Sequence, residues 1–239
     1  NSSESMILIN EAIKKKLFLM EAFMYRCHPQ TFKILELVEK YFTGKRVTIK
    51  SSFGFTTDVS KEHRLRNPNL AGGAILDVGC YPLSMARLIS GKLNGMDFSD
   101  PIDISVQGKL DETGVDASST AVLSFSNEIS AEIKTAIHEE YENNLIIESD
   151  GLSLEVSDPW HCGQFSEGKS VIKFSNEGTE EIIKINDEVG LFTREIDEAA
   201  NCIKQGRLES PQMTHKDSLG NMLWLEKWYT QLGVNFPNN

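Results

Sequence analysis

The stretch Ala71-Gly-Gly-Ala-Ile-Leu-Asp77-Val-Gly79-Cys-Tyr81-Pro82 combines three glycines with an acid and a tyrosine four residues apart. If Asp77 begins a helix, Tyr81 lies one turn later on the same face, where a carboxylate and a phenol can share a proton or a substrate hydroxyl. The glycines let another group approach the backbone closely. A helix-capping Asp77 and a packed Tyr81 fit the same spacing, so both interpretations stay open on the residues alone.

The chain on either side of this stretch has recognisable periodicity. Alternating apolar residues over 45–55 predict a half-buried strand, and the polar run 57–70 predicts a long loop that leads into the glycines. Residues 82–89 predict a short helix that Gly91 ends. The apolar run 17–25 predicts a buried strand.

Helices are predicted near both ends of the chain. Ser2 or Ser3 can cap a first helix, and Pro29 suits the first turn of a second helix that ends before Gly44. Two helices are expected after residue 190, the second of them capped by Thr214.

Between residues 102 and 186 the sequence predicts about seven strands. Asp150-Gly151 and the segment 176–178 are typical of hairpin turns between consecutive strands. Consecutive strands with helices gathered at the chain ends indicate an α+β fold, in which helices cover one face of a large, open, mixed or antiparallel sheet.

Composition and charge exclude several classes of protein. The 239 residues carry a net charge of −11, which disfavours nucleic acid and anionic membrane as partners. No apolar run approaches the length of a membrane-spanning helix, and the four cysteines lack CxxC spacing, which is typical of a reduced cytoplasmic protein. The five histidines show no metal-ligand spacing, so no metal site is expected, and no glycine-rich nucleotide fingerprint occurs.

Three segments together resemble the Gfo/Idh/MocA oxidoreductase family. They are Met20–Pro29, Gly72–Pro82 and the C-terminal run Glu195–Leu219, in the order that the family has them. The similarity is greatest to the branch that contains glucose–fructose oxidoreductase and dimeric dihydrodiol dehydrogenase. The resemblance implies residues 1–25 as the last helix and strand of an N-terminal Rossmann domain that is otherwise missing, and residues 26–239 as a C-terminal α+β substrate and dimerisation domain.

The resemblance also implies a site for hydride transfer between NAD or NADP and a sugar, polyol or cyclic diol. Asp77 and Tyr81 match the family's catalytic positions: Tyr81 would exchange the proton of the substrate hydroxyl, and Asp77 would orient that hydroxyl. Substrate contacts are implied for four residues and peripheral cofactor contacts for two more. The substrate residues are Arg26, Arg66, Gly72 and Gly73, and the cofactor residues are Pro29 and Gly79.

The family's catalytic lysine and dinucleotide site would precede Asn1, so these 239 residues alone are expected to bind no cofactor and to be inactive. A homodimer through the open sheet face is expected. Two alternatives remain: a non-catalytic binding or assembly module with this fold, and a lyase or hydrolase that uses Asp77 without a cofactor.

Overall fold

A single eight-stranded sheet organises the computed structural model, which describes residues 1–234 and 236. The strand order across the sheet is β2-β3-β4-β1-β5-β6-β7-β8. The strands are β1 (Val47–Gly54), β2 (Asp103–Leu110), β3 (Asp116–Ser124), β4 (Ile129–Ala136), β5 (Leu145–Ser149), β6 (Leu152–Val156), β7 (Lys169–Asn176) and β8 (Thr179–Asn186). Seven of them follow residue 102, as the sequence predicts.

The sheet is mixed because β1 pairs in parallel with β4, while every other neighbouring pair is antiparallel. The predicted hairpin turns lie between β5 and β6 and between β7 and β8. Gly151 and Gly178 both have positive φ, which these tight turns require. The chain is therefore an α+β protein with a large mixed sheet.

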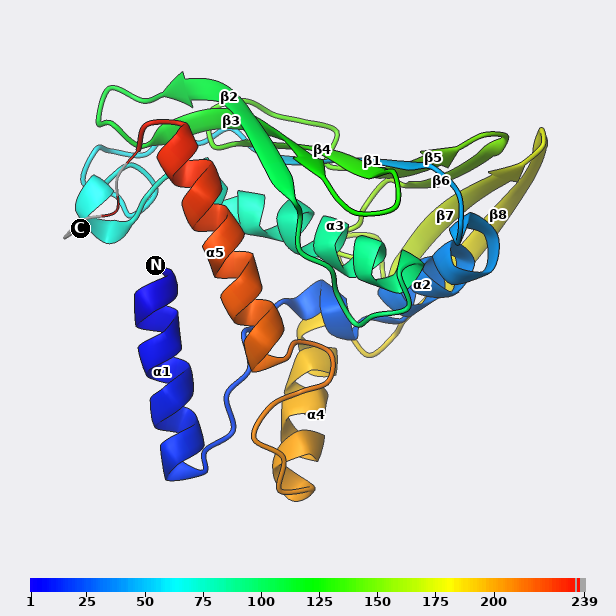
Figure 1. Cartoon of the computed structure of the whole chain (residues 1–239), viewed down its shortest axis with the longest axis horizontal. Helices are drawn as coiled ribbons and strands as arrows, with labels where there is room; N and C mark the ends of the chain where they lie inside the picture. Colours follow the sequence, from blue (N-terminus) through cyan, green and yellow to red (C-terminus); the bar gives the residue numbers. More distant parts are fainter. Residues whose placement is uncertain (235, 237–239) are drawn as a thin grey trace.

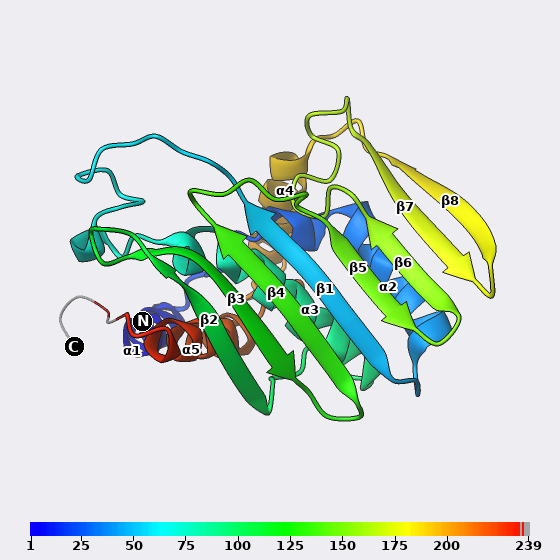
Figure 2. The ribbon, with the colours of Figure 1, turned by 90° about the horizontal axis from the view of Figure 1, so that it is seen from above.

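Helices cover one face of the sheet and leave the other open (Figures 1 and 2). The helices of the described residues are α1 (Ser2–Lys15), α2 (Pro29–Phe42), α3 (Cys80–Leu93), α4 (Leu191–Lys204) and α5 (His215–Gln231). The helices α2, α3 and α5 pack beneath the sheet, while α1 and α4 project away from it. The main core lies between the sheet and these helices, and it includes the fully buried Trp160 and Trp228.

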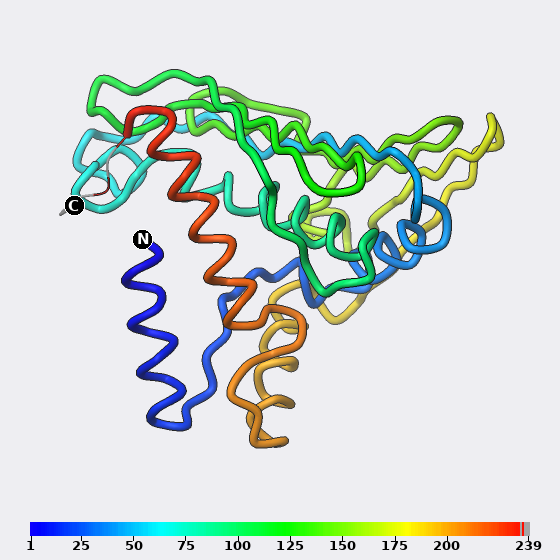
Figure 3. The backbone as a smooth tube through the Cα atoms, viewed as in Figure 1, coloured from blue at the N-terminus to red at the C-terminus, as the bar shows by residue number. Residues whose placement is uncertain are grey.

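The predicted strand over 17–25 is wrong. The segment is an extended connection that ends in a 3-10 turn, Met24–Cys27 (Figure 3). A strand needs a neighbouring strand with which it forms a series of backbone hydrogen bonds. In the described chain this segment makes one such bond to a distant residue, from the Leu19 N–H to the Leu208 carbonyl.

Two helix boundaries also differ from the prediction. Asn1, rather than Ser2 or Ser3, caps α1 by accepting the Glu4 N–H. Gly91 lies inside α3 instead of ending it. The backbone of Phe98 passes so close to Gly91 that a Cβ there would overlap it, so this glycine provides space for a chain crossing. Pro29 and Thr214 lie at the predicted helix starts.

Candidate functional site

The turn that leads into Asp77 is fixed by side chains from three separate elements. The Tyr229 hydroxyl on α5 donates to the Gly72 carbonyl at 3.3 Å, and the Thr135 hydroxyl on β4 donates to the Ala74 carbonyl at 2.9 Å. The Asp116 carboxylate at the start of β3 accepts the Ile75 N–H at 2.6 Å. The glycine stretch therefore lies where the sheet and α5 meet.

Asp77 lies within a π-helical turn, Ile75–Gly79, that runs directly into α3. The expectation that Asp77 caps or begins the helix is wrong, because the backbone is already helical at Ala74. The helix start is capped instead by Asp116, 41 residues away in sequence. Asp77 is consequently free of a capping role, and its side chain interacts elsewhere.

An ion pair joins Asp77 to the loop that precedes it. Arg64 Nη1 lies 2.6 Å from Asp77 Oδ1, and the Arg64 side chain is 66% exposed while that of Asp77 is 17% exposed. Arg64 was not singled out from the sequence. Its position in a long polar loop that leads into the motif is the signal that could have identified it.

Tyr81 lies within a group of aromatic rings from four segments. Its ring centroid is 5.4 Å from that of Phe23, 5.9 Å from Tyr25, 5.3 Å from Phe53 on β1 and 6.1 Å from Trp160. Phe53 and Trp160 are stacked with an interplanar angle of 12°. These rings hold the phenol in one place and form an apolar wall beside it.

Burial, followed by the negative groups nearby, raises the pKa of Tyr81 to about 12. Those groups include Asp77 and Glu195, and burial also raises the pKa of Glu195 and of Glu21. One carboxylate oxygen on each of the two glutamates is buried without a hydrogen-bond partner among the described residues. Tyr81 is therefore protonated near neutral pH and suited to donate a proton, and its acidic surroundings fit an added positive charge.

The glycines of the motif are packed against protein. A Cβ on Gly72 would lie 2.6 Å from the Arg64 carbonyl, and a Cβ on Gly73 would overlap the Asp116 carboxylate. Gly79 is buried, and a Cβ there would meet Thr135 and Trp228 at 3.3 Å. All three residues thus provide space for neighbouring protein segments. The resemblance implied instead that a substrate or cofactor approaches the backbone at these positions.

The two arginines of the predicted site lie in ion pairs of their own. Arg26, 2% exposed, bonds to Asp217 on α5 at 2.5 Å and to Ser84 on α3. Arg66 forms a two-pronged pair with Asp111, which lowers the pKa of that carboxyl to about 2. Neither arginine is hydrogen-bonded to Asp77 or Tyr81 in the structure.

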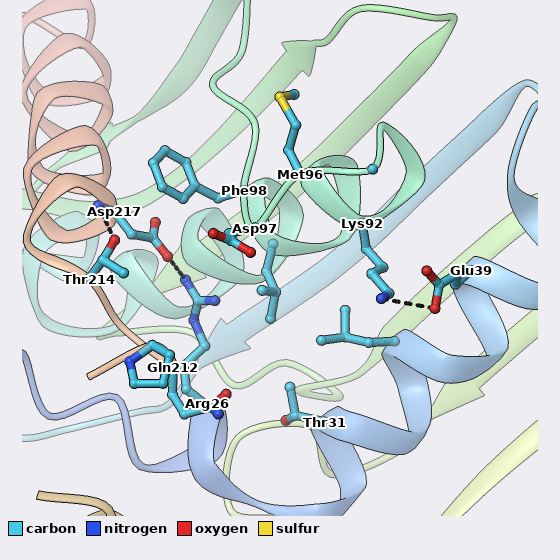
Figure 4. Close-up of a pocket in the computed structure, with 14 residues that line it drawn as sticks. Arg26, Thr31, Glu39, Lys92, Met96, Asp97, Phe98, Gln212, Thr214 and Asp217 are labelled. Atoms are coloured by element: carbon cyan, nitrogen blue, oxygen red, sulfur yellow. Dashed lines mark hydrogen bonds and ion pairs between the residues drawn. The ribbon is translucent and has the colours of Figure 1, made fainter. Parts of the chain in front are cut away.

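Arg26 also contributes to the wall of a cavity of about 280 Å³ between α2, α3 and the start of α5 (Figure 4). Arg26 points toward Asp217, and Lys92 points toward Glu39 at 2.9 Å across the cavity. Because Leu88 and Lys92 line it from the C-terminal half of α3, the cavity lies at the opposite end of that helix from Tyr81. Pro29, predicted near a cofactor, begins α2 in this region.

Within residues 1–234 and 236, no group of three His, Cys, Asp or Glu side chains is placed to hold a metal ion. The four cysteines are free thiols. Across the same described residues, no helix combines the length and apolar character that a membrane span needs.

The mixed sheet with helices on one face defines an α+β domain, with Asp77 and Tyr81 on the helical segment that enters it. A protein-family model for the GFO/IDH/MocA C-terminal domain matches residues 32–156, which is more than half of the chain. The chain belongs to the GFO/IDH/MocA family, and the curated relatives that it matches are named as dehydrogenases, among them a D-xylose 1-dehydrogenase (NADP(+)).

Two curated relatives illustrate the similarity. A trans-1,2-dihydrobenzene-1,2-diol dehydrogenase from Xenopus tropicalis is 29% identical over 238 residues, which cover 99% of this chain and 69% of the relative. A D-xylose 1-dehydrogenase (NADP(+)) 2 from Haloferax volcanii is 26% identical over 88% of this chain and 61% of the relative. The chain thus spans about two thirds of the length of these relatives.

Solved structures with lower identity share the fold. An aldose–aldose oxidoreductase from Caulobacter crescentus, complexed with glycerol, has a TM-score of 0.80 at 20% identity and covers 97% of this chain and 67% of its own. A 3-ketoreductase from Actinomadura kijaniata, in complex with NADP and TDP-benzene, has the same TM-score, identity and coverage.

Proposed function

We propose that this chain forms the substrate-binding half of an NAD(P)-dependent dehydrogenase that acts on a small molecule with hydroxyl groups: a sugar, a polyol or a cyclic diol. The observation that carries the proposal is the placement of Asp77 and Tyr81 on one continuous helical segment, with the Tyr81 phenol beside an apolar aromatic wall. The relatives named for xylose and dihydrodiol oxidation support this substrate class.

The chemistry of the chain's own residues is proton transfer at the substrate oxygen. In the direction of reduction, the protonated Tyr81 donates its proton to the carbonyl oxygen as that oxygen becomes a hydroxyl. In the direction of oxidation, Tyr81 must first lose its proton, and its raised pKa opposes this. Asp77, held by Arg64, accepts a hydrogen bond from a second substrate hydroxyl and so orients the reacting carbon.

NAD(P), when bound, supplies or takes the hydride. The acidic lining around Tyr81 fits a positive charge, either of an oxidised nicotinamide or of a lysine that would lower the pKa of Tyr81. The partnerless carboxylate oxygen of Glu195, which is one of the groups that raise the pKa of Tyr81, supports this fit, because a buried charge without a partner is costly. The nicotinamide and the lysine would both be contributed by a dinucleotide-binding domain.

The proposed division of the chain assigns residues 1–25 to that dinucleotide-binding domain and residues 26–239 to the substrate domain. The apolar side chains exposed on α1 and α4 support it. Ile7 and Leu8 on α1 and Ile196 on α4 are each more than 60% exposed, and Phe192 and Ile203 on α4 are at least half exposed. Apolar surface of this kind is typical of a surface that another domain covers.

We further propose that the open face of the sheet forms a homodimer interface. One row of residues crosses this face through all eight strands: Ser105, Val122, Glu132, Lys50, Ile146, Glu155, Lys173 and Ile182. It contains apolar residues between charges of both signs, which two copies related by a twofold axis can match. Sedimentation should detect a dimer that Lys50→Glu weakens and that Lys33→Glu, on α2, leaves intact. A wild-type monomer would exclude this interface.

Substrate binding can be measured on the chain itself because Trp160 lies beside Tyr81. Titration with D-xylose, glycerol or trans-cyclohexane-1,2-diol should change the tryptophan fluorescence, and Trp160→Phe should remove the signal. Tyr81→Phe and Asp77→Asn should each weaken binding about tenfold, as expected for the loss of one hydrogen bond. Tyr41→Phe, whose ring packs against Phe174, serves as the control.

A fluorescence response that survives in Tyr81→Phe and Asp77→Asn at unchanged affinity would contradict the proposed site. Binding that is confirmed at Tyr81 in a natural gene product without any nicotinamide-dependent turnover would favour the non-catalytic binding module instead.

A further inference from the structure

Asp116 is a buried acid whose carboxylate meets the helix that carries Asp77 and Tyr81. It begins β3 and is fully buried. Its Oδ2 accepts the Ile75 N–H at 2.6 Å, and the backbone N–H groups of Ala74 and of Asp116 itself also favour its charged form. No arginine, lysine or histidine nitrogen of the described residues lies within ion-pair distance of it.

The second oxygen of the same carboxylate explains why residue 73, just ahead of the turn, is a glycine, because it leaves no room for a side chain there. Asp116 Oδ1 is buried without a hydrogen-bond partner in the described residues, and it lies directly against Gly73. Gly73 has φ +113°, a conformation that residues with side chains rarely adopt. The turn and the carboxylate therefore fit each other only with glycine at this position.

We infer that Asp116 is a positioning residue, which holds the start of the helical segment on the sheet and so determines where Asp77 and Tyr81 point. Asp77 follows Ile75 by two residues in the same π-turn, and the residue before this turn provides no side-chain cap. The N–H groups at a helix start need acceptors, and here the acceptor comes from another element. The inference uses the proposed function only for the role of Asp77 and Tyr81.

The charge of this carboxylate can change near neutral pH, because burial without a cation raises the pKa of Asp116 to about 7. The titratable group that faces it from α5 is Tyr229, whose own pKa is raised by burial and by Asp116. The adjoining hairpin carries Asp111, which is neutralised by Arg66. Protonation of Asp116 weakens the charge-assisted bond to Ile75, so the position of Tyr81 should depend on pH.

The test follows ligand-free NMR signals of the chain from pH 5 to 9. The Asp116 carboxyl carbon, the Asp77 amide and the Tyr81 ring should titrate with one shared midpoint near pH 7. In Asp116→Asn, which keeps an accepting oxygen but cannot titrate, the Asp77 and Tyr81 inflections should vanish. Asp103→Asn, which changes an exposed acid on β2, should leave both inflections unchanged.

Asp116→Ala removes the acceptor altogether. Hydrogen exchange of the Ile75 amide should then be at least tenfold faster, while amides at the centre of β7 keep their protection. If this variant does not fold, the Asp116→Asn titration decides the question alone.

The inference is overturned if the Asp77 and Tyr81 inflections persist in Asp116→Asn, if they are absent from the wild type, or if a folded Asp116→Ala retains full protection of Ile75. These signals need no substrate or cofactor. A failure of the proposed dehydrogenase function would leave them in place, whereas a failure of the positioning role would remove them without affecting substrate binding at a fixed pH.

Discussion

At Tyr81, the surroundings oppose the charged state that alcohol oxidation needs. The phenol is enclosed by Phe23, Tyr25, Phe53 and Trp160, and the nearby ionisable groups that shift its pKa all raise it. A phenol in such a place is a proton donor, and it becomes a base only when a cation is added beside it. The surroundings of Tyr81 therefore agree with the proposal that a cation from outside residues 26–239 completes the site.

Gly73→Ala should be far more destabilising than its small size suggests. The new methyl group would overlap the Asp116 carboxylate and would hold φ in a strained region, for a total cost above about 2 kcal/mol. Gly44→Ala is the matched control, because Gly44 also has positive φ but no neighbour within 4 Å, so only about 1 kcal/mol is expected. Urea unfolding measures both values. Equal losses would show that the Asp116 contact is unimportant.

Asp116 also makes the stability of the fold depend on pH in a defined direction. Its pKa is raised from 3.8 to about 7 on folding, so between these values the folded state holds a proton that the unfolded state has lost. The free energy of unfolding therefore falls as pH rises from about 4 to about 7, by at most about 1.4 kcal/mol per pH unit from this group.

The difference in unfolding free energy between wild type and Asp116→Asn isolates this contribution. It should decrease across that pH range and become constant above about pH 8. A difference that is independent of pH would mean that Asp116 keeps an ordinary pKa in the folded protein.

The spacing of Asp77 and Tyr81 is local, so the sequence could offer them as a candidate pair, and the family resemblance supplied the roles that remain proposed for them. It could not select Asp116, Arg64 or Trp160, because their contacts with the motif depend on tertiary packing. The roles of Gly72 and Gly73 were understood only in part: their need for space was predictable, but the groups that use the space were not.

Among the elements, a buried charge network ties the 3-10 turn, α3 and α5 together. Asp217 bonds to Arg26 and to Arg87 at 2.5 Å each, and all three side chains are nearly inaccessible to solvent. A buried pair is costly to break because the remaining charge stays buried without a partner. This network fixes α5, which also carries Tyr229 and Trp228 to the motif.

Asp217→Ala should accordingly destabilise the protein by about 3–5 kcal/mol, since it leaves the buried Arg26 guanidinium without its acid and leaves the buried Arg87 paired only with the half-exposed Asp100. Glu36→Ala, which removes an exposed pair with Lys33 on α2, should cost less than about 1 kcal/mol. Thermal unfolding of both variants provides the comparison. A loss below 1 kcal/mol in Asp217→Ala would show that the network does not stabilise the fold.

Local periodicity predicted most elements, since strand alternation and helix capping are properties of neighbouring residues. It failed for residues 17–25, where apolar composition alone favours a strand but no hydrogen-bonding neighbour is present in the described chain. It also could not reveal that β1 inserts between β4 and β5 with a parallel partner on one side, because strand order depends on contacts across the whole sheet.

In the whole molecule, two surfaces carry exposed apolar side chains. One is the apolar side of α1 and α4, and the other is the open sheet face, where Val122 and Ile182 are exposed on the same face as charged residues such as Lys50 and Glu148. The first surface lies below the sheet and the second above it (Figure 1). The interface that we propose for a cofactor domain and the one that we propose for a second copy therefore lie on different sides of the sheet.

The measurement that tests the central claim most directly is NADP-dependent turnover of a polyol or diol by the natural enzyme that contains these residues, compared between wild type, Tyr81→Phe and Tyr41→Phe. Loss of the proton donor should lower kcat by about 10²–10⁴, while Tyr41→Phe should keep wild-type activity. A Tyr81→Phe enzyme that turns over at the wild-type rate would contradict the assignment of Tyr81 and, with it, the proposed site.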